Sequence, residues 1–119
     1  MKRANNQNRF ALCLINAGYP ASLERWKIYQ CREDSDATAH GQVRVVDESG
    51  EDYLYPSENF DLVALQRSTD GYAMSIPRLP GCWSQGKTAR EAVDNLQTAV
   101  REYVLVAQGL GRGPGVRDG

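Results

Sequence analysis

The sequence is poor in the residues that build metal centres and disulfide scaffolds. Its 119 residues include one histidine, His40, and three cysteines, Cys13, Cys31 and Cys82, which stand far apart in the chain. Zinc sites draw on closely spaced cysteine and histidine ligands, so the composition predicts no metal and no other cofactor. Three cysteines in a chain that is not secreted indicate reduced thiols. An oxidised pair between Cys13 and Cys31 is the alternative, if their strands are neighbours.

The sequence also lacks a long apolar run and an excess of charge of either sign. Residues 10–15 are apolar, but a membrane-spanning helix needs roughly 18 to 20 such residues. We therefore expect a cytoplasmic protein without membrane contact. Fourteen basic and fifteen acidic residues give a net charge of −1. Phosphate neutralisation usually requires a basic excess, so this balance argues against direct DNA binding.

The first half of the chain has the alternation and the turn residues that are typical of β-structure. Its strand-like segments are separated by turn signals such as Asn16-Ala17-Gly18 and Glu48-Ser49-Gly50. Residues 33–41 are polar and predict a loop with one helical turn. The strands that the pattern predicts cover residues 10–15, 24–32, 42–47 and 52–56.

The second half ends in the strongest helix signal of the sequence. Apolar residues recur at helical spacing from Ala92 to Val104, and Thr88 with Glu91 forms a capping-box pattern before them. Gly109 is a natural end for this helix. Ahead of the helix, the predicted strands cover residues 60–66, 72–77 and 82–85. Residues 60–65 could serve both halves, as the last strand of one sheet and the first strand of the next.

Residues 72–88 have the sequence YAMSIPRLPGCWSQGKT and lead directly into Glu91-Ala92 and Asn95-Leu96. This segment resembles the HicB family of antitoxins, in which a hairpin, a P-x-L-P-G-C bend, an S-Q-G-x-T turn and a helix beginning with E-A follow in this order. The resemblance extends over residues 60–108. It implies a β-β-β-α unit, a truncated RNase H-like arrangement, that binds and masks a small mRNA-cleaving toxin called HicA.

Each kind of residue in this motif also has a local structural role. The prolines stiffen the bend, the glycines permit backbone angles that other residues resist, and Thr88 satisfies amide groups at the helix start. The motif therefore identifies a family without marking a catalytic site. Many family members carry a DNA-binding segment after this unit, whereas here we expect only a disordered, glycine-rich tail over residues 109–119.

The first half resembles a group of very small bacterial proteins of unknown function. The similarity rests on residues 10–13, Gly18-Tyr19, residues 22–24, Lys27-Ile28-Tyr29, His40-Gly41 and the run over residues 45–56. It implies a compact β-barrel of SH3-like size and no particular activity. We therefore expect an α+β chain in which a small SH3-like β-barrel precedes the truncated RNase H-like unit. The expected divisions are a disordered start at residues 1–8, the barrel at 9–59, the HicB-like unit at 60–108 and the tail at 109–119.

An RNase H-like sheet invites a search for carboxylates that could bind a catalytic metal. The candidates in the second half are Asp61, Asp70, Glu91 and Asp94. A turn, a helix cap and an exposed helix face account for the last three, and Asp61 stands alone on its strand. We therefore expect no catalytic site and no enzyme.

Two further features of the first half are candidate sites. The acidic residues at 47–52 bracket a hairpin and favour a solvated turn over a cation site. His40 stands in a polar loop without a second ligand or a paired nucleophile, which favours a structural or exposed histidine.

Two binding functions fit the sequence. The favoured hypothesis is a non-catalytic type II antitoxin that masks a HicA-like toxin and forms homo-oligomers through exposed sheet edges. Its predicted partner contacts are Trp83, Arg78 and Gln85, chosen for their position beside the bend and at an edge. The alternative is a peptide- or small-ligand-binding β-barrel, in which the HicB-like unit serves oligomerisation. Its groove would be lined by the aromatic residues Tyr19, Trp26, Tyr29, Tyr53 and Tyr55.

Overall fold

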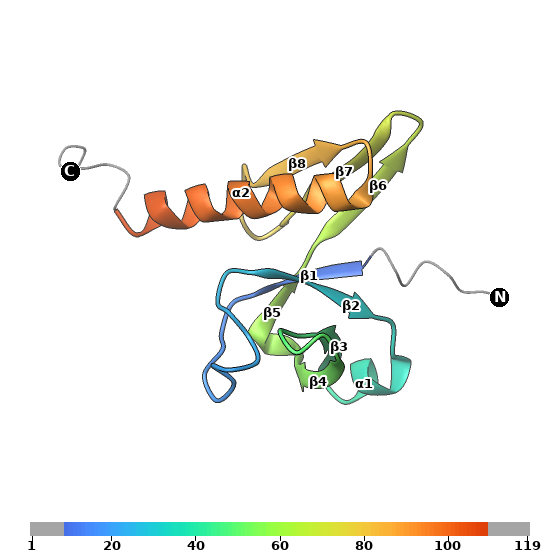
Figure 1. Cartoon of the computed structure of the whole chain (residues 1–119), viewed down its shortest axis with the longest axis vertical. Coiled ribbons are helices and arrows are strands. Elements are labelled where there is room, and N and C mark those ends of the chain that lie inside the picture. The colour runs from blue at the N-terminus through green and yellow to red at the C-terminus, as the bar shows by residue number, and fades with distance from the viewer. Residues whose placement is uncertain (1–8, 110–119) are drawn as a thin grey trace.

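Two antiparallel sheets lie on either side of one long helix in the computed structural model, which describes residues 9–109 (Figure 1). The chain is therefore α+β, as the sequence predicts. The segments expected to be disordered lie outside the described residues, apart from Gly109 itself.

The first sheet has the strand order β4-β3-β2-β1-β5, and every neighbouring pair is antiparallel. Its strands are β1 (Arg9–Cys13), β2 (Ile28–Arg32), β3 (Gln42–Val46), β4 (Asp52–Pro56) and β5 (Phe60–Leu62). A one-turn helix, α1 (Ser35–Ala39), joins β2 to β3, and the 3-10 helix η2 (Ser57–Asn59) joins β4 to β5. The loop with a helical turn expected at residues 33–41 is thus confirmed.

The start of β2 differs from the prediction, because the pattern predicts a strand from residue 24 and β2 begins at Ile28. Trp26 interrupts the strand with a left-handed backbone, at a φ of 72°. Its N–H donates a hydrogen bond of 2.7 Å to the carbonyl of Cys13. A left-handed residue cannot continue an extended strand, so the residues before Ile28 form a turn.

Strand β1 is buried on both faces, which explains its unbroken apolar sequence. Ala11 and Cys13 face the interior of the curled first sheet, whereas Phe10 and Leu12 face the long helix. Cys31 lies in the same interior as Cys13, and both are free, buried thiols. Burial raises the pKa of the Cys31 thiol to about 11. The oxidised pair that the sequence left open is therefore not formed here.

The first sheet does not close into a barrel in the part of the chain that the structure describes. No ladder joins its two edge strands, β4 and β5, anywhere between residues 9 and 109. The closed barrel of SH3-like size expected for this half is thus not shown. The structure shows instead an open, curled antiparallel sheet with its own small core.

The second sheet has the strand order β6-β7-β8 and is also antiparallel. Its strands are β6 (Ala64–Ser68), β7 (Gly71–Ser75) and β8 (Trp83–Gly86). The single strand predicted over residues 60–66 is divided at Val63, so that β5 pairs with β1 and β6 pairs with β7. This segment therefore does serve both halves of the molecule, one sheet after the other.

The long helix α2 (Ala89–Ala107) begins where the sequence predicts. The Thr88 hydroxyl accepts a hydrogen bond of 3.0 Å from the Glu91 N–H, and the Glu91 carboxylate accepts one of 2.6 Å from the Lys87 N–H. Gly86 lets the helix start approach β8, because a Cβ there would lie 2.5 Å from the amide nitrogen of Ala92. The turn over residues 86–88 thus brings α2 close to β8 and also caps the helix.

One hydrophobic core joins the two halves through α2. Figure 1 shows the helix lying between the first sheet and the β6–β8 sheet. Leu96 and its helical neighbours contact Phe10, Leu12 and Ile28 from the first sheet as well as Met74 from the second. The domain division at residue 60 stays a prediction, but the buried core contains residues from both sides of this boundary. No helix in the described chain could span a bilayer.

Candidate protein-binding surface

Strand β8 has one side covered by α2 and one side open. The Ser84 side chain points under the helix, where its hydroxyl donates a hydrogen bond of 2.7 Å to the carbonyl of Ala92. Trp83 is 57% exposed, whereas Ser84 is only 6% exposed. Because side chains alternate along a strand, Trp83 and Gln85 share the side that faces away from the helix.

The strand register places small and polar side chains beside the Trp83 indole. Ser75 pairs with Trp83, and Ala73 pairs with Gln85. Across β7, Ala64 pairs with Ser75 and Gln66 with Ala73. We define the open face as the residues that this register brings together on the uncovered side of the sheet: Ala64, Gln66, Ala73, Ser75, Trp83 and Gln85.

The open face combines an exposed tryptophan, Trp83, with an adjacent hollow. Trp83, Ser75 and Ala73 line an open hollow together with residues of β6. Small side chains at the middle of a sheet leave room for a partner's side chain, and an exposed tryptophan offers a large apolar area at low entropic cost. Binding hot spots are enriched in tryptophan, which makes this arrangement suitable for holding a protein surface.

The edge of the open face near Gln85 is acidic. Gln85 lines a second hollow that also contains Asp70, Glu91 and Lys87. The backbone carbonyl of Gln85 accepts a hydrogen bond of 2.8 Å from the Asn95 side chain, which fixes β8 to the helix. Two carboxylates against one ammonium group give this edge a local negative charge.

Arg78, the third predicted contact, is held apart from the hollow beside Trp83. Its guanidinium donates to the buried carboxylate of Asp61 at 2.9 Å, although the Arg78 side chain is 76% exposed. The ion pair ties the bend before β8 to β5 of the first sheet. The structure therefore brings Trp83 and Gln85 together, and it gives Arg78 a structural partner.

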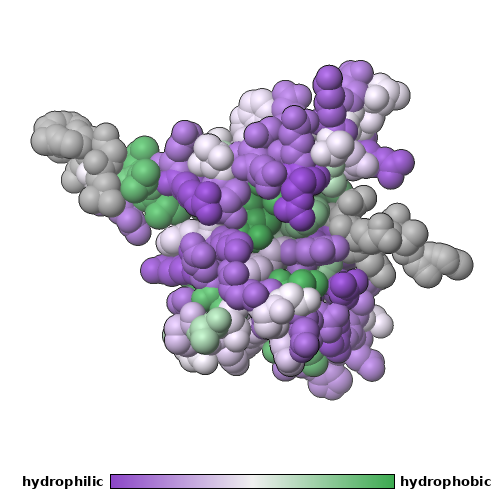
Figure 2. Space-filling view, in the orientation of Figure 1, coloured by the Kyte–Doolittle hydropathy of each residue, from purple (hydrophilic) through white to green (hydrophobic). Residues whose placement is uncertain are grey.

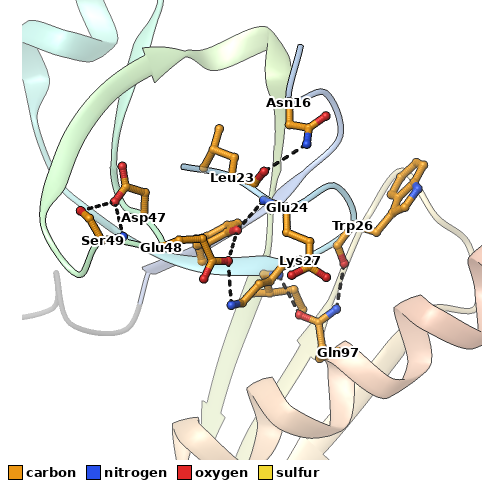
Figure 3. A network of polar contacts seen from close by, with 11 residues as sticks. Asn16, Leu23, Glu24, Trp26, Lys27, Asp47, Glu48, Ser49 and Gln97 are labelled. Carbon is orange, nitrogen blue, oxygen red and sulfur yellow. Dashed lines mark hydrogen bonds and ion pairs between the residues drawn. The ribbon is translucent and has the colours of Figure 1, made fainter. Parts of the chain in front are cut away.

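The acidic hairpin that the sequence presents as a solvated turn is instead a network of satisfied groups (Figure 3). Asp47 is buried and accepts hydrogen bonds from the Tyr55 hydroxyl and from Ser49. Glu48 accepts from the Lys27 ammonium at 2.8 Å and from a tyrosine hydroxyl. These carboxylates are occupied by donors within the fold, so they do not form an open cation site.

Hydrogen bonding also sets the ionisation of these two carboxyl groups. The Lys27 ammonium and the Tyr29 hydroxyl hold the pKa of Glu48 below its ordinary value. Burial works against the charged form of Asp47, but hydrogen bonds from Ser49 and Tyr55 outweigh it and lower its pKa. The network therefore favours the ionised form of both groups.

The remaining candidates of the first half have structural environments. Tyr55 is buried and packs edge-to-face on Tyr19, with ring centres 5.0 Å apart. Tyr29 is buried as well, so the aromatic residues do not line one common groove. The His40 ring contacts the carbonyl of Asp36 at 2.8 Å. Within residues 9–109, no three His, Cys, Asp or Glu side chains gather as metal ligands would.

Gln97 is the residue whose role sequence reasoning missed, because the helical pattern places it on the polar face of α2. Its side-chain oxygen accepts a hydrogen bond of 2.8 Å from the Ile28 N–H, and its nitrogen donates one of 2.8 Å to the carbonyl of Trp26 (Figure 3). This double contact fastens the helix to the first sheet. Both backbone groups lie at the left-handed turn that precedes β2, and the sequence carries no clear signal of that turn.

A second exposed apolar surface lies at the end of α2. Figure 2 shows hydrophobic atoms at the projecting end of the helix on a face that is otherwise largely hydrophilic. Leu105 and Val106 are exposed hydrophobic residues of this last part of the helix. Val106 lines a shallow hollow with Cys82 and Tyr103, which shares no residue with the hollow beside Trp83.

Comparison with known proteins gives a match to one family over the second half of the chain. Residues 61–112 match the family described as HicB-like antitoxin of bacterial toxin–antitoxin systems. This range contains β6 to β8, all six residues of the open face, and all of α2.

Two curated relatives match parts of the chain that are of comparable length. A UPF0150 protein of Thermoplasma acidophilum is 44% identical over 43 residues, which cover 35% of this chain and 62% of that protein. An uncharacterised 14.9 kDa protein from the rep-hol intergenic region of Haemophilus phage HP1 is 35% identical over 51 residues, covering 43% of this chain and 34% of that protein. The chain thus spans less than two thirds of either relative. No solved structure matches.

Proposed function

The second half of the chain is a HicB-like antitoxin domain, and from this premise we propose that the protein is the non-catalytic antitoxin of a type II toxin–antitoxin pair. Its partner would be a small, basic, HicA-like mRNA-cleaving protein, which the antitoxin masks by covering its surface. The observation that carries the proposal is the open face, where Trp83 is 57% exposed on a sheet whose other side is filled by the protein's own helix.

The chemistry of the open face supports a protein partner. The Trp83 indole would enter an apolar recess of the partner, while Ser75 and Gln66 offer hydrogen-bonding groups around it. The acidic edge formed by Asp70 and Glu91 beside Gln85 suits a basic partner, because complementary charge speeds association and selects the orientation. Arg78 could add a contact without leaving Asp61, since most of its side chain stays exposed.

The outer edge of β6 supports a further part of the proposal, namely homo-oligomers. In the described chain β6 pairs only with β7, so one side of its backbone is free to bind another strand. Such edges commonly pair with a second chain.

The proposal also includes two fold assignments and a location. The β6–β8 sheet with α2 would be a truncated RNase H-like unit, and the first sheet would be an open variant of a small SH3-like barrel. The protein would act in the cytoplasm, where the toxin cleaves mRNA.

Co-expression with a candidate toxin tests the proposal. The short reading frame next to the gene, if it encodes a small basic protein with a histidine, is expressed alone and together with this chain. We expect growth arrest from the neighbour alone, recovery of growth on co-expression, and co-purification of the two proteins. A toxic neighbour that this chain neither binds nor neutralises would contradict the proposal.

A matched variant shows whether neutralisation depends on the open face. Trp83→Ala should abolish recovery of growth, whereas Tyr53→Ala, which removes an exposed aromatic residue of β4, should preserve it. Loss of recovery with Tyr53→Ala alone would instead assign the binding surface to the first sheet.

A further inference from the structure

A cavity of about 490 Å³ opens at one end of the first sheet. Small-molecule sites have volumes of about 300–1,000 Å³, so this cavity is large enough for a ligand of modest size. It lies where the sheet does not close, with residues of α1 on one side and Phe60 and Leu62 of β5 on the other. It shares no residue with the open face.

The floor of the cavity is the uncovered end of the first sheet's own core. Cys31 and Phe60, two buried core residues, line it together with Val43. Strand alternation places Leu62 on the same face as Phe60, yet Leu62 is 55% exposed. A leucine that faces the core side of a sheet and still contacts solvent indicates apolar surface that residues 9–109 leave uncovered.

One cation at the cavity has no carboxylate partner in the part of the chain that the structure describes. Arg32 and Arg44, which also line the cavity, form ion pairs of 2.8 to 2.9 Å with Asp52 and Asp34 respectively. Arg9 forms no ion pair within residues 9–109, and strand alternation places it on the same face of β1 as the core residues Ala11 and Cys13. Its charge acts on the floor, because it partly opposes the rise that burial causes in the pKa of Cys31.

We propose that this cavity binds a small apolar carboxylic acid, whose hydrocarbon body covers Phe60 and Leu62 and whose carboxylate pairs with Arg9. The proposal goes beyond the antitoxin role and does not depend on it. Glu33 also lines the cavity and has no described ion-pair partner. Its negative charge repels an anionic ligand, so removal of the Glu33 charge should strengthen binding, whereas removal of the Arg9 charge should weaken it.

Decanoate, used below its micellar concentration, is a suitable probe, and decanol is its uncharged counterpart. Titration of the ¹⁵N-labelled full chain should give saturable shifts for amides around the cavity, with decanoate bound more tightly than decanol. Arg9→Gln should weaken decanoate binding at least about fivefold, because it removes a charge-assisted hydrogen bond. Glu33→Gln should strengthen decanoate binding, and both variants should leave decanol binding unchanged.

A second variant tests the apolar part of the site. Leu62→Glu changes a side chain that is largely exposed, so the fold should persist, as the unchanged amide spectrum of α2 would verify. It should weaken the binding of both probes. Equal affinity for decanoate and decanol, shifts confined to other surfaces, or no saturable binding would overturn the proposal.

Discussion

The two sheets of this molecule differ in what covers their faces. In the first sheet, Ala11 and Leu12 are adjacent residues of β1 that point to opposite faces, and both are fully buried. In the second sheet, adjacent Trp83 and Ser84 of β8 are exposed and buried respectively. Strand β1 of the first sheet is thus covered on both faces by the fold itself. Within residues 9–109 the second sheet keeps one face free, and this is the face to which we propose that a partner binds.

Helix α2 explains the difference. It fills one face of the second sheet and simultaneously covers the outer face of β1 and β2. A lone three-stranded sheet with one helix would bury little apolar surface, and small domains with small cores are marginally stable. The first sheet therefore supports the antitoxin-like unit as well as its own core, and variants of α2 should affect both halves.

The largest expected effect comes from Leu96, which is fully buried in the shared core. Leu96→Ala should lower the free energy of unfolding by about 3 kcal/mol, from lost burial and the cavity left behind. Leu105→Ala, on the exposed part of the same helix, should cost less than about 1 kcal/mol. Urea unfolding followed by circular dichroism measures both.

The same variant tests whether the two halves unfold together. Val45 is fully buried in the first sheet's own core, so amide hydrogen exchange at Val45 reports the first half. With Leu96→Ala, exchange at Val45 should accelerate together with exchange in α2. Unchanged exchange at Val45 would contradict a shared core.

The next largest effect should come from Gln97. Gln97→Ala leaves the Ile28 N–H and the Trp26 carbonyl without their partner, and unsatisfied backbone groups of this kind cost about 2 kcal/mol. Thr98→Ala, one residue along on the exposed side of the helix, is the matched control and should change stability by less than about 0.5 kcal/mol. Hydrogen exchange of the Ile28 amide should accelerate in Gln97→Ala and not in Thr98→Ala. Equal exchange in both variants would exclude a stabilising role for the double contact of Gln97.

A smaller effect is expected in acid, from the hairpin carboxylates of the first half. Glu48 and Asp47 have pKa values below their ordinary range in the folded chain. Such groups stabilise the fold above their unfolded-state pKa, and the contribution is lost as the pH falls through the folded-state pKa. The free energy of unfolding should therefore fall from about pH 5 downward. Glu48→Gln and Lys27→Met should both reduce this loss of unfolding free energy in acid. If urea unfolding at several pH values gave the same pH dependence for both variants as for the unmodified chain, the role of these carboxylates would be refuted.

The smallest effect on stability is expected on the open face. Trp83→Ala should change the free energy of unfolding by no more than about 0.5 kcal/mol, because most of the indole already contacts water. Ser84→Val, at the adjacent covered position, removes the hydrogen bond to Ala92 and should cost more. Thermal unfolding of the two variants compares the two sides of one strand directly, and a larger loss in Trp83→Ala would mean that the indole belongs to the core.

Much of this fold could be predicted because its signals are local. The capping pattern at Thr88 and the helical spacing after it fix α2, and turn residues separate the strands. The continuous apolar run of β1 reflects burial on two faces. The prediction was wrong at Trp26, where a hydrogen bond to Cys13 holds a left-handed turn inside an apparently alternating strand.

The site is less visible in the sequence, because it depends on register and on a third element. The positions of Trp83 and Gln85 in the chain predict them as contacts, but their neighbours Ala64 and Gln66 follow only from the pairing of β6 with β7. The polar face of α2 likewise gave no sign that Gln97 contacts a strand from the other half. Periodicity shows that a face is polar, and it does not show what that face contacts.

The central claim is that the open face binds the proposed toxin. The affinity of purified variants of this chain for the partner protein that co-purifies with it tests this claim most directly. Trp83→Ala should weaken binding at least about 30-fold, as expected for loss of a hot-spot residue worth about 2 kcal/mol. Tyr53→Ala, its exposed aromatic counterpart on β4, should change affinity less than about threefold. The opposite result, with Trp83→Ala binding like the unmodified chain and Tyr53→Ala impaired, would contradict the account.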